Sequence, residues 1–166
     1  MKEIVFDIET TGLNPLNSRI TCICAKVIGG DAFYSYKNNE KELILDFIEW
    51  LKKEKVSKLI STNGRDFDLP FIFMRSFTWG FEYKDISFLK WDIKHFDLIN
   101  DITNRKISLN NLARLYGFEL KNGNGLKAIK LFQENRLIEL KDYCMYDVLL
   151  TEKIYLKYLE IKNDKR

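Results

Sequence analysis

The sequence of 166 residues is poor in the residue types that interrupt or cross-link a chain, with two prolines, eight glycines and three cysteines. Because 46% of its residues are hydrophobic and 14% aromatic, it does not have the composition of a disordered or low-complexity chain. No apolar run approaches the roughly 20 residues that a membrane-crossing helix needs. The opening MKEIVFDIE carries acidic residues where a signal peptide would be apolar. We therefore expect a cytoplasmic protein that folds as one domain over residues 1–166.

Soft metal ligands are scarce as well. Cys22 and Cys24 lie in the apolar run ITCICAKVI, and a Cys-x-Cys pair with no third ligand nearby is a weak signal for a metal. We interpret both as small buried hydrophobes. The single histidine, His95, lies in KWDIKHFDL, and we interpret it as a structural or surface residue.

The hydrophobic pattern predicts an α/β protein. Residues 3–9, 19–28, 32–36 and 58–62 are expected strands. Helices are expected after an Asn39 cap, over 70–77, from a Ser108 cap to Gly117, and over 125–134 and 138–161. The hydrophobic residues of segment 79–107 follow neither helical nor strand spacing clearly. Three consecutive strands followed by mixed elements imply a sheet with helices packed over it.

The first candidate site residues are Asp7 and Glu9. They are two residues apart on a strand, so both carboxylates point to the same face. Buried like charges are costly unless a cation lies between them, and oxygen ligands of this kind suit Mg²⁺ or Mn²⁺. The alternative is an exposed edge strand with a solvated face.

Two later segments carry similar chemistry. Asn63-Gly64-Arg65-Asp66-Phe67-Asp68 lies at a strand-to-helix junction, where Asp68 could equally be an ordinary helix N-cap. Tyr143 and Asp147 are four residues apart and share a face of the last predicted helix. In isolation, that pair would be a solvated aspartate beside a core tyrosine.

Together the three segments resemble the DEDD superfamily of 3′–5′ exonucleases, in its tyrosine subtype. The matching motifs are Asp7-x-Glu9 followed by Thr-Gly-Leu, then Asn63 with Phe67-Asp68, then Tyr143-x-x-x-Asp147; SLNNLARLYG (108–117) is also similar. The proofreading domains of family B DNA polymerases and their freestanding relatives are the most similar group. The resemblance implies a ribonuclease-H-like, three-layer α/β fold, with a mixed sheet of about five strands and helices on both faces.

The resemblance also implies residue roles. Two divalent metal ions, Mg²⁺ or Mn²⁺, would be held by Asp7, Glu9, Asp68 and Asp147. Two ions about 4 Å apart stabilise both the attacking and the leaving oxygen of a phosphoryl displacement. Tyr143 would orient the attacking water and help to deprotonate it. The sister subtype has histidine where this chain has Asp142. Asp97, in HFDLIN, is interpreted as structural support because the acidic quartet is complete without it.

Substrate contacts follow from the same likeness. Leu13 would wedge against the terminal bases, Phe67 would pack near the 3′ nucleotide, and Thr10 and Asn63 would contact the 3′ end. Candidates for backbone contacts are Arg65, Lys121 and Lys127. A net charge of +3 is compatible with a nucleic-acid partner without requiring one.

The expected activity is release of nucleoside 5′-monophosphates from the 3′ end of single-stranded nucleic acid, with DNA favoured over RNA. The alternatives are an RNA 3′-end trimming exonuclease and a non-catalytic module of the same fold that binds nucleic acid or a polymerase. We expect a monomer without a membrane partner, which works with a replication or repair protein.

Overall fold

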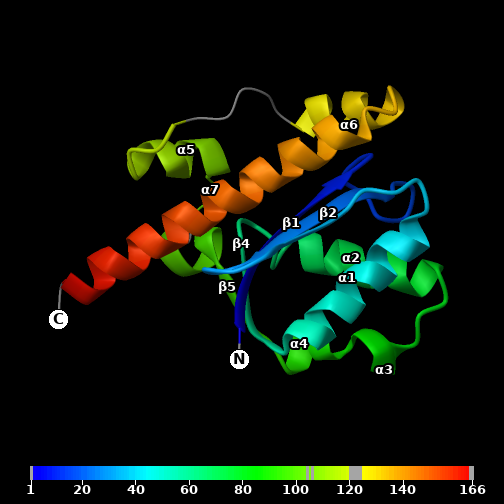
Figure 1. Cartoon of the computed structure of the whole chain (residues 1–166), viewed down its shortest axis with the longest axis horizontal. Coiled ribbons are helices and arrows are strands. Elements are labelled where there is room, and N and C mark those ends of the chain that lie inside the picture. The colour runs from blue at the N-terminus through cyan, green and yellow to red at the C-terminus, as the bar shows by residue number, and fades with distance from the viewer. Residues whose placement is uncertain (1, 104, 106, 120–124, 165–166) are drawn as a thin grey trace.

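The structure is a computed structural model that describes residues 2–103, 105, 107–119 and 125–164. Its strands form one mixed sheet in the order β3-β2-β1-β4-β5 (Figure 1). β1 pairs antiparallel with β2 and parallel with β4; β2 pairs antiparallel with β3, and β4 parallel with β5. The strands are β1 (Lys2–Thr10), β2 (Ile20–Val27), β3 (Ala32–Ser35), β4 (Val56–Ser61) and β5 (Lys94–Asp97).

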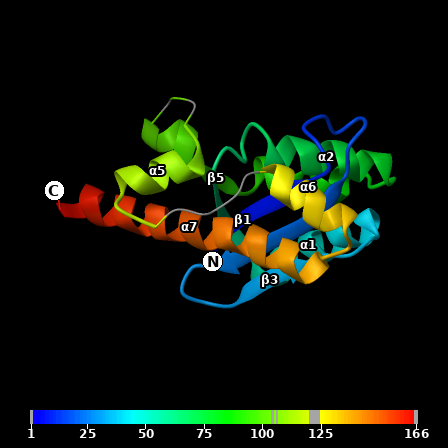
Figure 2. The same cartoon turned by 90° about the horizontal axis from the view of Figure 1, so that it is seen from above.

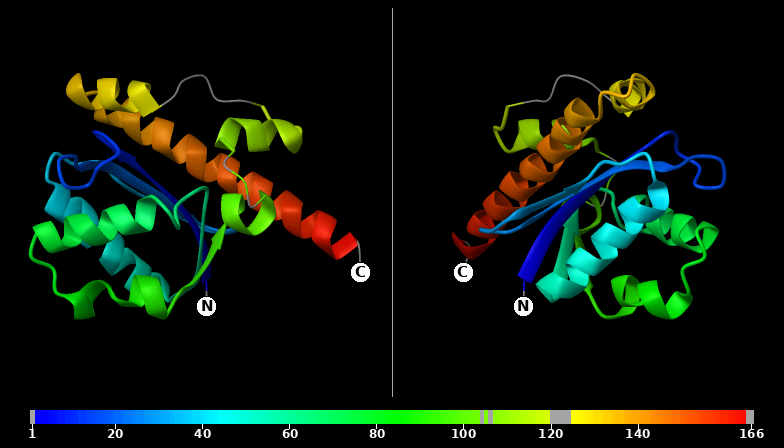
Figure 3. Two further views of the ribbon diagram at one scale, coloured as in Figure 1. Left: turned by 180° about the vertical axis from the view of Figure 1, so that it is seen from behind. Right: turned by 45° about the vertical axis from the view of Figure 1, so that its right-hand side comes forward.

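Helices cover both faces of the sheet, which confirms the expected three-layer fold (Figure 3). One face packs against α1 (Glu40–Glu54), α2 (Asp68–Thr78), α3 (Tyr83–Ile86) and α4 (Phe88–Trp91). The other packs against α5 (Leu109–Leu115), α6 (Gly125–Gln133) and α7 (Leu137–Asp164). Seen from above, the long α7 runs across the sheet with α5 and α6 beside it (Figure 2). None of the described helices is long and apolar enough to span a membrane.

Side chains alternate along β1 between the two faces of the sheet, and each face has its own hydrophobic core. Ile4, Phe6 and Ile8 pack into the core under α1 and α2, whereas Val5 packs into the core under α7. Asp7 and Glu9 therefore face α7. Because β1 lies between β2 and β4, the alternative of an exposed edge strand is wrong.

The segment without a clear period, 79–107, contains the short helices α3 and α4, strand β5 and a π-helical turn, η1 (Ile99–Thr103). Each of these elements has four or five residues, which is too short for a helical or strand period to become visible in the sequence. β5 completes the sheet by pairing Lys58–Ser61 of β4 with Lys94–Asp97.

Helix α2 is anchored by a buried acid on α1. The Glu40 carboxylate is 1% exposed and accepts hydrogen bonds from Arg75 Nη2 at 2.6 Å and from the Trp79 indole at 2.8 Å, both near the end of α2. It also accepts from the Ile20 N–H at the start of β2, at 2.7 Å. A buried charge needs such partners, and here they fix α2 relative to the sheet.

His95 on β5 is a structural residue. Its Nε2 lies 2.7 Å from Ser61 Oγ, and its buried Nδ1 has no hydrogen-bond partner among the described residues. Burial lowers the pKa of His95 to about 4, outweighing the opposing effect of Asp97. Protonation would bury a cation whose Nδ1 has no hydrogen-bond partner among the described residues.

We expect His95 to make the protein sensitive to acid. Its folded pKa lies below the unfolded value of about 6.5, so the unfolded state takes up the proton first as pH falls. Between pH 7 and pH 5 this costs about 2 kcal/mol of unfolding free energy. Urea unfolding at both pH values should show that loss in the wild type and a smaller one in His95→Gln. An equal loss in both proteins would contradict the assignment.

Candidate active site

The site lies where strands β1 and β4 diverge. Their parallel pairing ends at Val5 and Ile60, and β4 ends one residue later, while β1 continues to Thr10. Ligands of α/β sheets usually bind at the carboxyl ends of parallel strands. Side chains from β1, from the segment after β4 and from α7 meet at this opening.

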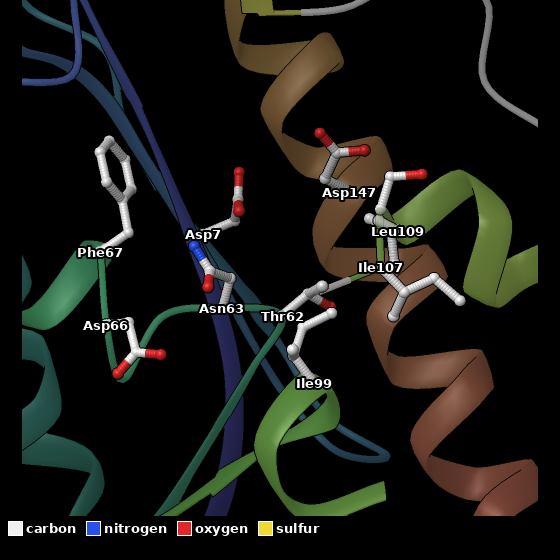
Figure 4. A pocket seen from close by; sticks show the side chains of 10 residues that line it. Asp7, Thr62, Asn63, Asp66, Phe67, Ile99, Ile107, Leu109 and Asp147 are labelled. Carbon is white, nitrogen blue, oxygen red and sulfur yellow. The ribbon is translucent and has the colours of Figure 1, made fainter. Parts of the chain in front are cut away.

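A hollow of about 180 Å³ lies in the opening. All five residues predicted to be catalytic line it, together with two predicted substrate contacts: Asp7, Glu9, Asp68, Tyr143, Asp147, Asn63 and Phe67. A larger cavity of about 750 Å³ adjoins it, and five residues line both: Asp7, Thr62, Asn63, Phe67 and Asp147. Asp7 and Asp147 point into the space between β1 and α7 (Figure 4). Three segments far apart in the sequence thus converge on one pocket.

Asp68 is the first residue of α2, and its side chain reaches β1. Phe67 occupies the N-cap position, and no side chain caps this helix. Instead, Asp68 Oδ1 accepts a hydrogen bond of 3.1 Å from the Ile8 N–H, beyond the point where β1 pairs with β4. The alternative that Asp68 is an ordinary N-cap is therefore wrong. Burial raises its pKa to about 7, and the nearby Asp97 and Asp147 add to that rise.

The turn before α2 needs its Asn-Gly pair. Asn63 has φ of +65°, a left-handed conformation that asparagine tolerates better than most residues. A Cβ atom on Gly64 would lie 2.5 Å from Ser61 Oγ, so no larger residue fits without displacing β4. This close approach turns the chain sharply enough to place Asn63 and Phe67 on the pocket wall.

Asp97 holds that turn in place from the neighbouring strand β5. Its carboxylate is fully buried and accepts hydrogen bonds from the Asn63 N–H at 3.1 Å and the Arg65 N–H at 2.9 Å. It also accepts from the Ile99 N–H at 2.9 Å, at the start of η1. The expectation that Asp97 gives structural support agrees with these contacts, because Asp97 lines neither cavity but holds the backbone of Asn63 and Ile99, which do.

Tyr143 and Asp147 reach the pocket from one face of α7. Burial raises the pKa of Tyr143, and the charges of Glu9, Asp147 and Asp7 contribute to the rise. Lys127 Nζ on α6 lies 5.7 Å from the centre of the Tyr143 ring. Tyr146 points elsewhere, and its hydroxyl donates to the Glu119 carbonyl at 3.2 Å.

The donor set fits a divalent metal. Asp7, Glu9, Asp68 and Asp147 supply carboxylate oxygens, and no described lysine or arginine is among the side chains that line the hollow. Glu9 is 8% and Asp68 4% exposed, so water screens their charges poorly. Carboxylates gathered this closely repel one another, and a divalent cation among them would relieve that repulsion; hard oxygen donors suit Mg²⁺ or Mn²⁺.

Three other predicted contacts, Thr10, Leu13 and Arg65, line neither of the two cavities. Thr10 ends β1, and its hydroxyl donates to the Gly12 carbonyl at 2.8 Å. Leu13 is 85% exposed on the loop that follows. The Arg65 guanidinium donates to Asp101 and to the His95 carbonyl, each at 2.7 Å, and faces a neighbouring apolar hollow. Lys121 is outside the residues that the structure describes.

Sequence reasoning missed one wall of the larger cavity. Ile99 of η1 and Leu109 of α5 line it together with Ile107, Ser108 and Asp66 (Figure 4). The resemblance over 108–117 was the one signal that pointed to this region. Ile99 and Ile107 lie in the segment 79–107, whose hydrophobic residues follow neither helical nor strand spacing. No local pattern could therefore place them at the site.

A mixed five-stranded sheet with helices on both faces and carboxylates at the end of its central strand is a ribonuclease-H-like domain of the polymerase-exonuclease type. The structure aligns over 96% of its length, with a TM-score of 0.79 and 17% identity, with the family B DNA polymerase from the hyperthermophilic archaeon Pyrobaculum calidifontis. The chain covers 24% of that polymerase, so this likeness shows the fold.

The chain belongs to the family of predicted 3′–5′ exonucleases related to the exonuclease domain of PolB, whose pattern matches residues 26–164. It is also 38% identical over 76 residues to the uncharacterized protein MJ0365 of Methanocaldococcus jannaschii. That alignment covers 46% of this chain and 42% of the relative. The family match begins after β1, so the assignment of Asp7 and Glu9 rests on motif and geometry.

Proposed function

We propose that this chain is a metal-dependent 3′–5′ exonuclease that removes nucleoside 5′-monophosphates from single-stranded nucleic acid by a two-metal-ion mechanism. Single-stranded DNA is the favoured substrate. The observation that carries the proposal is the pocket in which Asp7, Glu9, Asp68 and Asp147 meet Tyr143 around one hollow. The family membership supports the same direction of digestion.

Asp7, Glu9, Asp68 and Asp147 would hold the ions. When bound, two divalent ions supply a more acidic water and offset the charge of the attacking and leaving oxygens. The chain's own contribution is to hold these carboxylates rigidly. Asp68 is oriented by the Ile8 N–H, and its burial keeps water from competing for the site.

The larger cavity is suited to the terminal nucleotide. Phe67 forms one side, with its ring 5.5 Å from that of Phe71 behind it, and Ile99 and Leu109 form another. Apolar and aromatic walls bind any base because every base has a stackable face. Discrimination between sequences is therefore expected to be weak.

Tyr143 acts as a positioning residue for the attacking water. Burial is the largest cause of its raised pKa, and cations in the site would offset the neighbouring charges but not the burial. The phenol therefore stays protonated at neutral pH and orients water by hydrogen bonding. Bound ions would make the water more acidic, and its proton would pass to solvent.

We expect Tyr143→Phe to lower kcat about 10- to 100-fold, the range for groups that orient a metal centre without binding the ion, with little change in KM. Tyr146→Phe is the matched control, because it removes a hydroxyl three residues away that bonds to Glu119. Single-turnover digestion should separate the two variants. A pH–rate profile that loses an ionisation in Tyr143→Phe would show that the phenol is a base instead.

The proposed function is tested by a time course on 5′-labelled strands, DNA and RNA, single- and double-stranded, with Mg²⁺ or Mn²⁺. Stepwise shortening to products one nucleotide apart is expected, fastest on single-stranded DNA and absent in EDTA. Immediate release of the labelled terminal nucleotide would mean the opposite polarity. Inactivity of folded protein on every substrate with either ion would favour the non-catalytic binding module.

We also propose that the 3′ end is bound weakly and released after few steps, unless the chain docks on a replication or repair protein. No described lysine or arginine lines either cavity, which limits contacts with the phosphate backbone. A challenge with unlabelled competitor strand during digestion distinguishes distributive from processive action.

A further inference from the structure

The three cysteines converge on one point beneath the carboxylate site. Across the β1–β2 pair, Asp7 is opposite Cys24 and Glu9 is opposite Cys22. Residues directly opposite in a ladder share a face, so both thiols point toward α7. Cys144 meets them from α7, next to Tyr143. All three are fully buried and form no disulfide.

The spacing of the sulfurs is suitable for metal coordination. Cys22 Sγ and Cys24 Sγ are 3.7 Å apart, and all three sulfurs lie within 4.8 Å of one another. A point equidistant from three atoms with this spacing lies at most about 2.8 Å from each, close to the Zn–S distance of about 2.3 Å. A cation fits among the sulfurs with only small side-chain movements.

Asp7 lies close enough to the sulfurs to supply a fourth ligand. Cys144 Sγ lies 3.6 Å from Asp7 Oδ2, and Asp7, Glu9 and Cys144 also form a close group. Zinc-type ions prefer four ligands in a tetrahedron, which three sulfurs and one carboxylate oxygen would supply. The surroundings are apolar, with Val5, Leu140 and Val148 in the same core. Such a site favours soft thiophilic ions and is unsuited to hydrated Mg²⁺.

We propose that Cys22, Cys24 and Cys144 form a second metal site, which takes one thiophilic cation such as Zn²⁺ or Cd²⁺, with Asp7 Oδ2 as fourth ligand. The sulfurs lie one layer behind the pocket wall, so the ion enters through the carboxylate hollow. One consequence rests on the proposed function: an ion held there would occupy Asp7 and so stop digestion that depends on Mg²⁺.

The test is a titration of the full chain with Cd²⁺, in a phosphine reductant and a large excess of Mg²⁺. Thiolate-to-metal charge transfer in the ultraviolet reports binding through sulfur. We expect saturation at one equivalent in the wild type. Cys22→Ala/Cys24→Ala should bind more than about 100-fold more weakly, because two of three thiolates are lost. Asp7→Asn should keep the sulfur signal and bind more weakly than wild type.

X-ray absorption of the Zn²⁺-loaded wild type keeps the test independent of how well the double variant folds. Three sulfur neighbours at about 2.3 Å are expected. A shell made of oxygen or nitrogen alone, or wild-type affinity in a folded double variant, would overturn the proposal. Neither measurement uses nuclease activity, so a protein that binds the ion through sulfur but is inactive with Mg²⁺ even when that ion is absent would refute the proposed function and leave this site standing.

Discussion

Asp7→Asn is expected to reduce exonuclease activity at least about 10³-fold while leaving the protein folded. Asp7 lines both the hollow and the larger cavity, so it lies where the ions and the scissile phosphate would meet. Charge stabilisation by a bound metal is worth several kcal/mol in the transition state, and each 1.4 kcal/mol is a factor of ten in rate. Replacing the carboxylate with an amide keeps the shape and removes the charge.

The fold should tolerate this change, because one fewer negative charge relieves repulsion among the buried carboxylates. Thermal melting in EDTA should therefore show no loss of stability for Asp7→Asn. Asp142→Asn is a matched control, since Asp142 is an exposed aspartate on α7 paired with Lys141. Such surface pairs contribute little. Activity of Asp7→Asn within about tenfold of that control would refute the assignment of Asp7 to the metal site.

The parts of the site that could be predicted are those governed by local periodicity. Alternation placed Asp7 and Glu9 on one face of a strand, and helical spacing put Tyr143 beside Asp147. Each inference needs only a few neighbouring residues. The sequence motifs then brought Asp68 into the set, although its local pattern equally suggested a helix cap.

What escaped prediction depends on contacts between distant residues. Cys144 meets Cys22 and Cys24 because α7 crosses β2, which no spacing within the sequence expresses. The β1–β2 register that sets the two thiols opposite Glu9 and Asp7 is likewise a property of the assembled sheet. β5 escaped because four residues, three of them with charged or ionisable side chains, are too few to show alternation.

The stabilising role of Asp97 also depends on residues that are distant in the sequence. Its position in HFDLIN suggested structural support, but its partners Asn63 and Arg65 are 34 and 32 residues away. Three backbone N–H groups within 3.1 Å depend on its carboxylate. A buried donor left without an acceptor costs about 1–3 kcal/mol.

We therefore expect Asp97→Ala to lose about 2–3 kcal/mol of unfolding free energy, because the Ile99 donor is buried and bears the full cost, while the partly buried Asn63 and Arg65 donors bear less of it. This is a large share of the roughly 5–15 kcal/mol that stabilises a domain. Urea unfolding near neutral pH measures it. The exposed Asp92, at the end of α4, gives the control Asp92→Ala, which should stay within about 0.5 kcal/mol of wild type.

Asp97→Asn keeps one oxygen acceptor and tests the link from this carboxylate to the site. Its amide N–H₂ would face backbone N–H groups, so the turn carrying Asn63 should loosen while α7 and its carboxylate stay in place. We expect a milder loss of stability and a rise in KM larger than the fall in kcat, because the turn lines the proposed nucleotide cavity rather than orienting the water. Equal falls in kcat and kcat/KM with unchanged KM would show that Asp97 supports the carboxylates instead. Wild-type stability in Asp97→Ala would mean that other acceptors replace the carboxylate, and that the turn does not depend on β5.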